Sequence, residues 1–340
     1  MKVIVTGGTG YIGSHTITDL LENNFEVVCI DSLARSTKYA LKAIEQITNK
    51  RIKFYQIDLC NKQDTFDVLE QHKDAVGIIH FAAFKTVPES VANPLLYYNN
   101  NLISLNNVLE GIQKFNIPNF VFSSSCSVYG NTKELPVTED TPFQEAESAY
   151  AHTKQIGEQI IQHYSKVSST QSILLRYFNP VGAHPSGLLG EMTVNKPDNL
   201  VPYITQTAIG KLEQLTVFGS DYDTPDGSCI RDYIHVCDIA HAHTLALQYL
   251  IENNNKTNCE VFNLGTGKGV SVLEAIYAFE KVTNRKLNYI IGARRSGDVE
   301  KIYANNTKAA IALKWKCRYN IEDAMLSAWN WEVKMKESGL

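Results

Sequence analysis

The sequence predicts an α/β protein built on a doubly wound parallel sheet. Short apolar runs alternate with helical patterns through the first half of the chain, as in a parallel sheet that is covered on both faces. A glycine-rich loop, GGTGYIG at residues 7–13, joins the first apolar run to the first helical pattern. Polar or small residues follow most of the runs, at the carboxyl ends of the predicted strands, where such sheets bind ligands.

The strands are predicted from six short runs that are rich in β-branched and aromatic residues. These runs are KVIVT (2–6), EVVCI (26–30), IKFYQI (52–57), GIIHFA (77–82), NFVFSSS (119–125) and SILLRYF (172–178). The spacing of apolar residues between them predicts helices at about 14–23, 37–48, 62–71, 101–115 and 148–167. In the first of these helices Ile17, Leu20 and Leu21 share one face.

Three glycines of the loop have the spacing that dinucleotide binding requires. Gly7 allows the tight turn, Gly10 lets a pyrophosphate approach the backbone, and Gly13 lets the helix and the strand pack closely. The phosphates then lie at a helix N-terminus, where free N–H groups favour negative charge. Asp31 ends the second strand, where the 2′-hydroxyl of a ribose would need an acceptor. Glycines that only shape a surface turn would not need a strand before them, a helix after them and an acidic residue at the end of the next strand.

The amino-acid composition changes after Asn179. Two loop-rich stretches, at 179–200 and 219–228, contain many Gly, Pro, Asn and Asp residues, as loops over a binding site often do. We therefore expect a dinucleotide-binding domain at 1–179 and a smaller α/β substrate-binding domain at 180–340. Later segments are expected to return to the first sheet, so that the two domains are partly interleaved.

Composition excludes several classes of protein. The 32 basic and 36 acidic residues give a formal charge of −4, and no Lys/Arg block favours nucleic acid or a membrane as a partner. Apolar runs such as VGIIHFAAF (76–84) fall short of the ~20 residues that span a bilayer. The first strand leaves no room for a signal peptide. Seven scattered cysteines, without a close pair, favour a reducing cytoplasm.

The catalytic candidates are Ser125, Tyr150 and Lys154. YAHTK places the phenol and the ammonium four residues apart, on one face of a helix. Lowering the pKa of a tyrosine from about 10 to about 7 requires roughly 4 kcal/mol, which a cation at ~4 Å supplies when the effective dielectric is near 20. Tyr150 then becomes a general base for a hydroxyl that loses hydride, and Ser125 hydrogen-bonds the same oxygen. A tyrosine followed by such a lysine also occurs by chance, so the glycine loop is needed for this interpretation.

With these motifs the sequence resembles the UDP-glucose 4-epimerase family, within the extended short-chain dehydrogenase/reductase group. The resemblance extends over essentially the whole chain, and RYFNPVGAHPSG and RDYIHV are its most specific segments. It also includes TGGTGYIGSHT, HFAAFKTVPES, FSSSCSVYG, YAHTK, NLGTG and RRSGD. It implies a Rossmann fold, a bound NAD, UDP-glucose and UDP-galactose as substrates, inversion at carbon 4 through a transient 4-keto sugar, a role in galactose metabolism and a homodimer.

The family pattern also implies a set of site residues. Cofactor-binding residues would be Gly7, Gly10, Tyr11, Ile12, Gly13, Asp31, Ser32, Ser36, Asp58, Leu59, Phe81, Ala82, Ala83, Lys85, Asn100, Ser123, Tyr150, Lys154, Tyr177 and Phe178. Substrate-binding residues would be Ser125, Asn179, Asn199, Leu200, Phe218, Arg231, Arg295, Asp298 and Ile302. In this pattern Arg231 and Arg295 hold the diphosphate and Asp298 holds the uridine ribose.

Simpler interpretations exist for some of these residues. Asn199 could cap a loop, Phe218 could be a core aromatic, and Arg231 could form a structural ion pair with Asp232. His235, His241 and His243 do not have a convincing ligand spacing, so no metal is expected. Cys126 is expected to be a small packed residue rather than a nucleophile.

The chain departs from the family pattern at a few positions. Cys126 stands where alanine is common, Ala151 where glycine is common, and Arg35 where asparagine is frequent. Arg35 could attract a 2′-phosphate, but Asp31 would repel it, which favours NAD over NADP. Ile302 replaces a tyrosine that in some members excludes N-acetylated sugars, so UDP-GlcNAc and UDP-GalNAc are expected as further substrates, or even as the main ones.

Two other functions compete with this prediction. A nucleotide-sugar 4,6-dehydratase would need an acidic pair after Ser125, and Cys126 and Ser127 stand there instead. A non-catalytic NAD-binding regulator would have little reason to keep Ser125, Tyr150 and Lys154 together.

Overall fold

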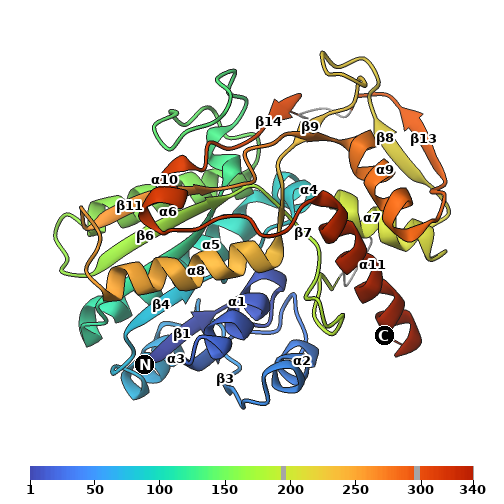
Figure 1. The fold of residues 1–340 in the computed structure, drawn as a ribbon. Coiled ribbons are helices and arrows are strands. Elements are labelled where there is room, and N and C mark those ends of the chain that lie inside the picture. Colours follow the sequence, from blue (N-terminus) through green and yellow to red (C-terminus); the bar gives the residue numbers. More distant parts are fainter. Residues whose placement is uncertain (193–196, 295–298, 340) are drawn as a thin grey trace.

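A parallel sheet forms the centre of the computed structural model, which describes residues 1–192, 197–294 and 299–339 (Figure 1). Within these residues the main sheet has seven strands in the order β11-β6-β5-β4-β1-β2-β3, and the pairs are parallel. The strands are β1 (Lys2–Thr6), β2 (Glu26–Ile30), β3 (Lys53–Tyr55), β4 (Gly77–His80), β5 (Asn119–Ser125), β6 (Gln171–Tyr177) and β11 (Cys259–Leu264). The predicted α/β class is therefore confirmed.

Helices cover both faces of the sheet. One apolar core lies between the sheet and α1 (Tyr11–Glu22), α2 (Tyr39–Thr48) and α8 (Val236–Ile251). A second core, on the opposite face, involves α3 (Lys62–Gln71), α5 (Pro94–Phe115) and α6 (Ala149–Tyr164). The interior of β1 is fully buried, because side chains on both faces of a doubly covered strand contact helices.

The predicted elements of the first half agree with the structure except at some boundaries. β1, β2 and β5 have the predicted bounds, and β3 and β4 are shorter. α5 begins at Pro94 instead of near residue 101, because proline suits the first turn of a helix and the polar run YYNNN hides the helical pattern. The short helix α4 (Val87–Ala92) lay outside the prediction.

The second half of the chain forms smaller units to one side of the sheet (Figure 1). Among the described residues β7 (Asn179–Val181) pairs with β10 (Tyr233–His235), and β8 (Leu215–Phe218) pairs with β13 (Tyr289–Gly292). β9 (Ile230–Arg231) lies between β12 (Val270–Ser271) and β14 (Lys301–Ile302). The remaining helices are α7 (Leu200–Ala208), α9 (Val272–Thr283), α10 (Thr307–Ala312) and α11 (Ile321–Glu337).

Three later elements return to the first sheet, and one of them is α10, which packs against β11. α8 packs against α1, and β11 forms the edge of the sheet beside β6. The chain therefore crosses between the two parts of the molecule more than once. The boundary at residue 179 stays a prediction.

The structure also bears on membranes, disulfides and metals. No helix among the described residues is long and apolar enough to cross a membrane. All seven cysteines are free. In the described part of the chain, no group of three or more His, Cys, Asp or Glu side chains is placed to hold a metal ion.

Candidate active site

The predicted site residues follow one edge of the sheet. The strand order places the carboxyl ends of β6, β5, β4, β1, β2 and β3 side by side. Neighbouring strands are ~4.8 Å apart, so this edge extends over roughly 24 Å. Tyr177 and Ser125 lie near one end of it, and Asp58 follows β3 at the other. A long ligand such as a dinucleotide fits along this edge.

The glycine loop is shaped for close approach of a ligand. Gly7 has φ +67°, and a Cβ there would lie 2.7 Å from the Ala82 nitrogen. A Cβ at Gly13 would lie 2.3 Å from the Gly7 oxygen. At Gly10 the nearest atom to a Cβ is the Gly7 oxygen, at 3.2 Å, and no side chain caps α1 there. The first N–H groups of α1 can therefore receive an anion such as a pyrophosphate.

Asp31 lies beside this loop. Its carboxylate accepts hydrogen bonds from the Thr9 N–H at 3.1 Å, the Leu33 N–H at 2.9 Å and the Ser36 hydroxyl at 3.1 Å. Ser32 is exposed in the same turn. The carboxylate is thus held next to the place where the ribose of a bound nucleotide would lie.

Arg35, which follows this turn, interacts with two other side chains. Its Nη2 pairs with Glu89 at 2.6 Å, and its guanidinium carbon lies 4.9 Å from the centroid of the Phe84 ring. The charge that could have attracted a 2′-phosphate is therefore already paired.

The residues after β3 and β4 complete the cofactor side. Asp58 accepts a hydrogen bond from the Cys60 N–H at 2.9 Å, and Leu59 is buried. The backbone of Ala82 packs against Gly7, which gives this segment its place beside the loop. The other predicted residues here lie as follows: Tyr11 and Ile12 begin α1, Phe81 packs on His243, Ala83 follows Ala82, and Asn100 donates to Asn101.

Ser125, Tyr150 and Lys154 meet at the end of β5. Ser125 is the last residue of β5, and its side chain is near enough to Tyr150 to act on the pKa of that phenol. Tyr150 and Lys154 lie one turn apart on α6. Lys154 Nζ donates to the Ser123 carbonyl oxygen at 2.6 Å, so the buried ammonium is fixed to the same strand.

The pKa of Tyr150 depends on burial and on the charges around the phenol. Burial raises the pKa of Tyr150, and the polar side chain of Ser125 acts in the opposite direction. Lys154 Nζ lies 5.9 Å from the centroid of the Tyr150 ring. At an effective dielectric near 20 the ammonium would stabilise a negative charge at the centre of the ring by about 2.8 kcal/mol, which corresponds to a decrease of about two pKa units. Lys154 is therefore placed to stabilise a phenolate on Tyr150 by an amount of this order.

The pKa of Lys154 is also shifted from its ordinary value. Burial lowers the pKa of Lys154 to about 8, and the charge of Glu158 opposes this shift. Tyr177 and Ser123 stand on the adjacent strand ends, with 2.7 Å between their hydroxyl oxygens. Phe178 is buried beside them.

The predicted substrate residues come from several small elements. Asn179 begins β7, and its N–H donates to the Asp232 carbonyl oxygen at 2.9 Å. Asn199 precedes α7 without capping it through its side chain, and Leu200 is the first residue of that helix. Phe218 on β8 is 44% exposed, so it is not the core aromatic of the simpler interpretation.

Arg231 and Ile302 lie opposite each other on paired strands. They are register partners in β9 and β14, and Arg231 Nη1 donates to the Ile230 carbonyl oxygen at 2.9 Å. Asp232 accepts hydrogen bonds from Thr266, Gly267 and Ala304, which gives its carboxylate a structural role. Arg295 and Asp298 lie outside the described residues.

Two carboxylates near the site, the buried Glu158 and the partly buried Glu191, were not singled out from the sequence. Glu158, one turn beyond Lys154 on α6, pairs with Arg176 at 2.6 Å. Its spacing from Lys154 was a signal that could have found it. Glu191 accepts hydrogen bonds from Lys85 at 2.8 Å and from Asn199 at 2.9 Å, and thereby joins the cofactor side to the substrate side. No local pattern marks Glu191, since its partners are distant in sequence.

Comparison with known proteins shows the family of this chain. The family model described as GDP-mannose 4,6 dehydratase matches residues 4–327. The chain is 46% identical over 335 residues to UDP-glucose 4-epimerase 2 of Arabidopsis thaliana, covering 97% of this chain and 94% of that protein. The chain belongs to the UDP-glucose 4-epimerase family. The family model is broader, since the dehydratase in its description would need an acidic pair where Cys126 and Ser127 stand.

Solved structures of the epimerase family superpose on nearly the whole chain. UDP-glucose-4-epimerase from Stenotrophomonas maltophila, with bound NAD and formylated UDP-arabinopyranose, has a TM-score of 0.96 at 40% identity and covers 99% of both chains. UDP-glucose 4-epimerase from Bifidobacterium longum, in complex with NAD+ and UDP, has a TM-score of 0.92 at 43% identity and covers 98% of both chains.

Proposed function

We propose that this member of the epimerase family interconverts UDP-glucose and UDP-galactose with a resident NAD. The observation that carries the proposal is the meeting of Ser125, Tyr150 and Lys154 at the end of β5, in a chain that resembles UDP-glucose 4-epimerases over nearly its full length. The enzyme is an isomerase, because substrate and product differ only in configuration at carbon 4.

The residues along the sheet edge fit NAD. The uncapped N-terminus of α1 would hold the pyrophosphate, and Asp31 would accept a hydrogen bond from the adenosine ribose. The pairing of Arg35 with Glu89 supports NAD rather than NADP. When bound, NAD+ would supply a hydride acceptor and a positive charge.

The protein groups handle the proton and the orientation of the sugar. Tyr150 removes the proton from the 4-hydroxyl as the C4–H bond loses its hydride, and Ser125 hydrogen-bonds the same oxygen. Lys154 stabilises the phenolate from its fixed place on Ser123. The 4-keto sugar then turns over in the site, and Tyr150 returns the proton to the oxygen when the hydride returns to the opposite face of carbon 4.

The test is to incubate purified protein, without added cofactor, with each of the four UDP-sugars and to identify the products by nuclear magnetic resonance. We expect interconversion of UDP-glucose and UDP-galactose. A Tyr150→Phe variant should lose nearly all turnover and keep its NAD. Native protein that contains NAD but leaves all four sugars unchanged would support the rival, a non-catalytic NAD-binding regulator.

The substrate range is proposed to include UDP-GlcNAc and UDP-GalNAc. Ile302 is 6% exposed and packs in a cluster with Val128 and Phe178 near the catalytic end. Isoleucine is smaller than tyrosine, which leaves room for an acetamido group. An Ile302→Tyr variant should lose activity on the N-acetylated sugars and keep activity on UDP-glucose; full activity on both would contradict this assignment.

A homodimer is proposed through α4 and α5. These helices expose apolar side chains, of which Leu95 is 72% exposed. The others are Val87, Val91, Leu96 and Ile103. Such a patch on a monomer is typical of an interaction surface. Light scattering should give twice the chain mass for the native protein and the chain mass for Leu95→Glu, whereas a native monomer would refute the proposal.

The cytoplasm is proposed as its location. The free cysteines are scattered without close pairs, which suits a reducing compartment.

A further inference from the structure

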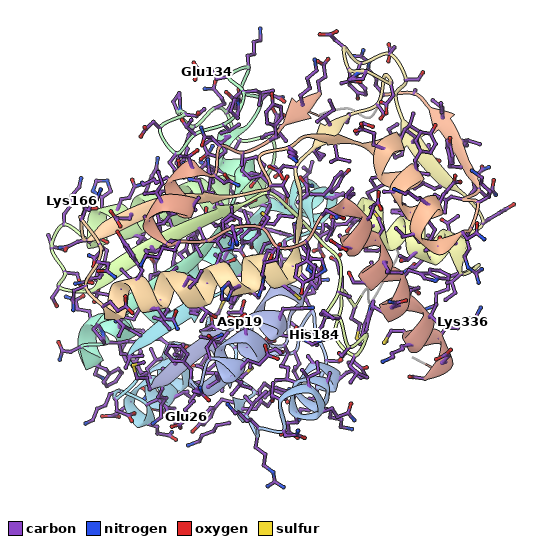
Figure 2. All side chains as sticks on the ribbon, in the orientation of Figure 1. Asp19, Glu26, Glu134, Lys166, His184 and Lys336 are labelled. Carbon is purple, nitrogen blue, oxygen red and sulfur yellow. The ribbon has the colours of Figure 1, made fainter. Side chains whose placement is uncertain are left out.

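A loop segment from the second half of the chain lies across the glycine loop. Residues 183–192, called the strap below, follow β7 and run between α11 and the α1–α2 region (Figure 1). His184 on the strap is labelled in Figure 2 and lies close to α1, with 6.4 Å between its ring centroid and that of His15. Leu189 and Gly190 of the strap line a small cavity whose opposite wall includes Gly10. The strap thus forms the outer wall of the proposed pyrophosphate site.

The strap is fastened to the cofactor side at both ends. At its start the Tyr11 hydroxyl donates to the Gly182 carbonyl oxygen at 2.5 Å. Near its end Glu191 pairs with Lys85 at 2.8 Å. Thr37 also donates to the Met192 sulfur at 3.5 Å.

Trp331 of α11 packs against the strap. The indole is 5% exposed, and its Nε1 donates to the Glu191 carbonyl oxygen at 3.3 Å. A Cβ at Gly190 would lie 2.5 Å from the indole ring, so the strap backbone directly contacts Trp331. The ring also packs on Tyr39 of α2, with 5.9 Å between centroids. Trp331 therefore joins the strap to the nucleotide-binding half.

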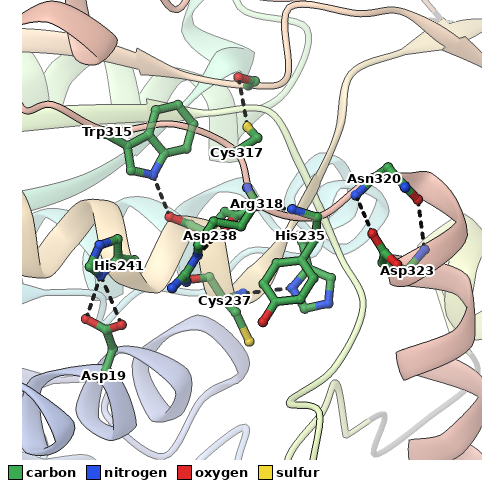
Figure 3. A network of polar contacts seen from close by, with 12 residues as sticks. Asp19, His235, Cys237, Asp238, His241, Trp315, Cys317, Arg318, Asn320 and Asp323 are labelled. Carbon is green, nitrogen blue, oxygen red and sulfur yellow. Dashed lines mark hydrogen bonds and ion pairs between the residues drawn. The ribbon is translucent and has the colours of Figure 1, made fainter.

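The position of α11 is itself fixed by a network of polar contacts that includes the buried Asp238 (Figure 3). Asp238, in the first turn of α8, accepts hydrogen bonds from Arg318 Nε and from the Arg318 N–H, both at 3.0 Å. Asn320 and Asp323 then form a reciprocal cap at the start of α11. The side chain of Ser327, further along α11, accepts a hydrogen bond from the Ala183 N–H at 3.1 Å. The strap consequently rests on a helix that is anchored to the main sheet.

We infer that the strap, held down by Trp331 and by the Glu191–Lys85 ion pair, is what keeps NAD in the site between turnovers. This inference rests on the proposed NAD site. It assigns Trp331 and Glu191 as positioning residues that act on cofactor release rather than on the reacting atoms. The release rate of NAD is then set by opening of the strap.

The test compares two tryptophans of α11. Trp331→Ala removes the contact with the strap. Trp329→Ala removes a similarly buried indole that packs instead on Phe279, with 5.7 Å between centroids. Both variants are loaded with radiolabelled NAD, and the loss of label into an excess of unlabelled NAD is followed. We expect Trp331→Ala to release NAD at least about tenfold faster than the native protein, which corresponds to ~1.4 kcal/mol, and Trp329→Ala to release it at nearly the native rate.

Added NAD should restore the kcat of Trp331→Ala, because the reacting groups are unchanged. Equal release rates for the two tryptophan variants, or a native rate for Trp331→Ala, would overturn the inference. If Trp331→Ala does not fold, Glu191→Gln keeps the shape of the strap and removes the ion pair; it should also release NAD faster, and a native rate would again overturn the inference. Native protein without NAD or without epimerase activity would refute the proposed function instead.

Discussion

Replacing Lys154 with methionine tests the electrostatic account of Tyr150. Lys154 is 4% exposed, and its Nζ lies 5.9 Å from the centroid of the Tyr150 ring. At an effective dielectric near 20 the ammonium stabilises a phenolate by about 2.8 kcal/mol. Methionine keeps most of the volume and removes the charge. The pKa of Tyr150 should therefore rise by about two units in the variant.

The sign of the change determines the pH profile. A phenolate forms as the pH rises through the tyrosine pKa, so a higher pKa leaves about a hundredfold less phenolate at neutral pH. The burial-lowered pKa of Lys154, about 8, implies that the native lysine loses its charge above that pH. The deficit of the variant should consequently be largest below pH 8 and shrink above it.

The assay is kcat for UDP-galactose between pH 6 and 10, measured with NAD-saturated protein. Ultraviolet difference spectra of tyrosinate give an independent readout of the pKa. Lys154→Arg, which keeps the charge, should retain a profile closer to that of the native enzyme. If Lys154→Met loses the same factor at every pH, the lysine acts by positioning and the electrostatic reasoning is wrong.

Three further predictions concern the framework of the site. Glu158→Gln should lower the free energy of unfolding in urea by about 3–5 kcal/mol, because it leaves the buried Arg176 guanidinium unpaired; Glu110→Gln, which breaks a half-exposed pair with Lys62, should cost no more than about 1 kcal/mol. Gly13→Ala should purify with much less NAD, since its Cβ would lie 2.3 Å from the Gly7 oxygen; a full complement of NAD would contradict the close-packing role. Burial lowers the pKa of His80 to about 3, so the unfolded chain binds a proton at this site as the pH falls below ~6.5 while the folded protein does not. At pH 5 His80 should therefore cost about 2 kcal/mol of stability relative to pH 7. His80→Gln should remove that share of the loss, and an unchanged pH dependence would contradict it.

The sequence sufficed for features that depend on neighbours along the chain. Strands such as β1 and β5 are short apolar runs, and their burial on both faces is visible in their composition. The i, i+4 spacing of Tyr150 and Lys154 on α6 is likewise local. Because side chains at the ends of parallel strands share one edge, the cofactor side of the candidate site could also be predicted.

Distances within the site were less predictable. The sequence placed Lys154 beside Tyr150, but the lysine reaches past the ring to the Ser123 carbonyl oxygen. A buried ammonium needs acceptors, and the nearest backbone oxygen determines where it rests. The sequence alone does not show that this oxygen holds the ammonium.

Contacts between distant segments escaped the prediction altogether. Lys85 and Glu191 are 106 residues apart, and Arg318 and Asp238 are 80 apart. Neither pair has a local signature, since charged residues at such positions usually lie in solvent. The helix α11 was likewise not predicted to contact the nucleotide-binding half.

The glycine loop alone does not determine the rate at which NAD is released, because contacts between distant segments also affect it. The loop, Asp31 and the N-terminus of α1 supply groups that bind a dinucleotide, and such groups serve equally in proteins that exchange their cofactor. An epimerase has no net redox change, so it gains nothing from release between turnovers. In this protein the groups that we infer to oppose release are Glu191 and Trp331, which the second half of the chain brings over the loop, and Lys85, which pairs with Glu191. Retention is therefore a property of the strap and α11, and it can be altered without changing the glycine loop.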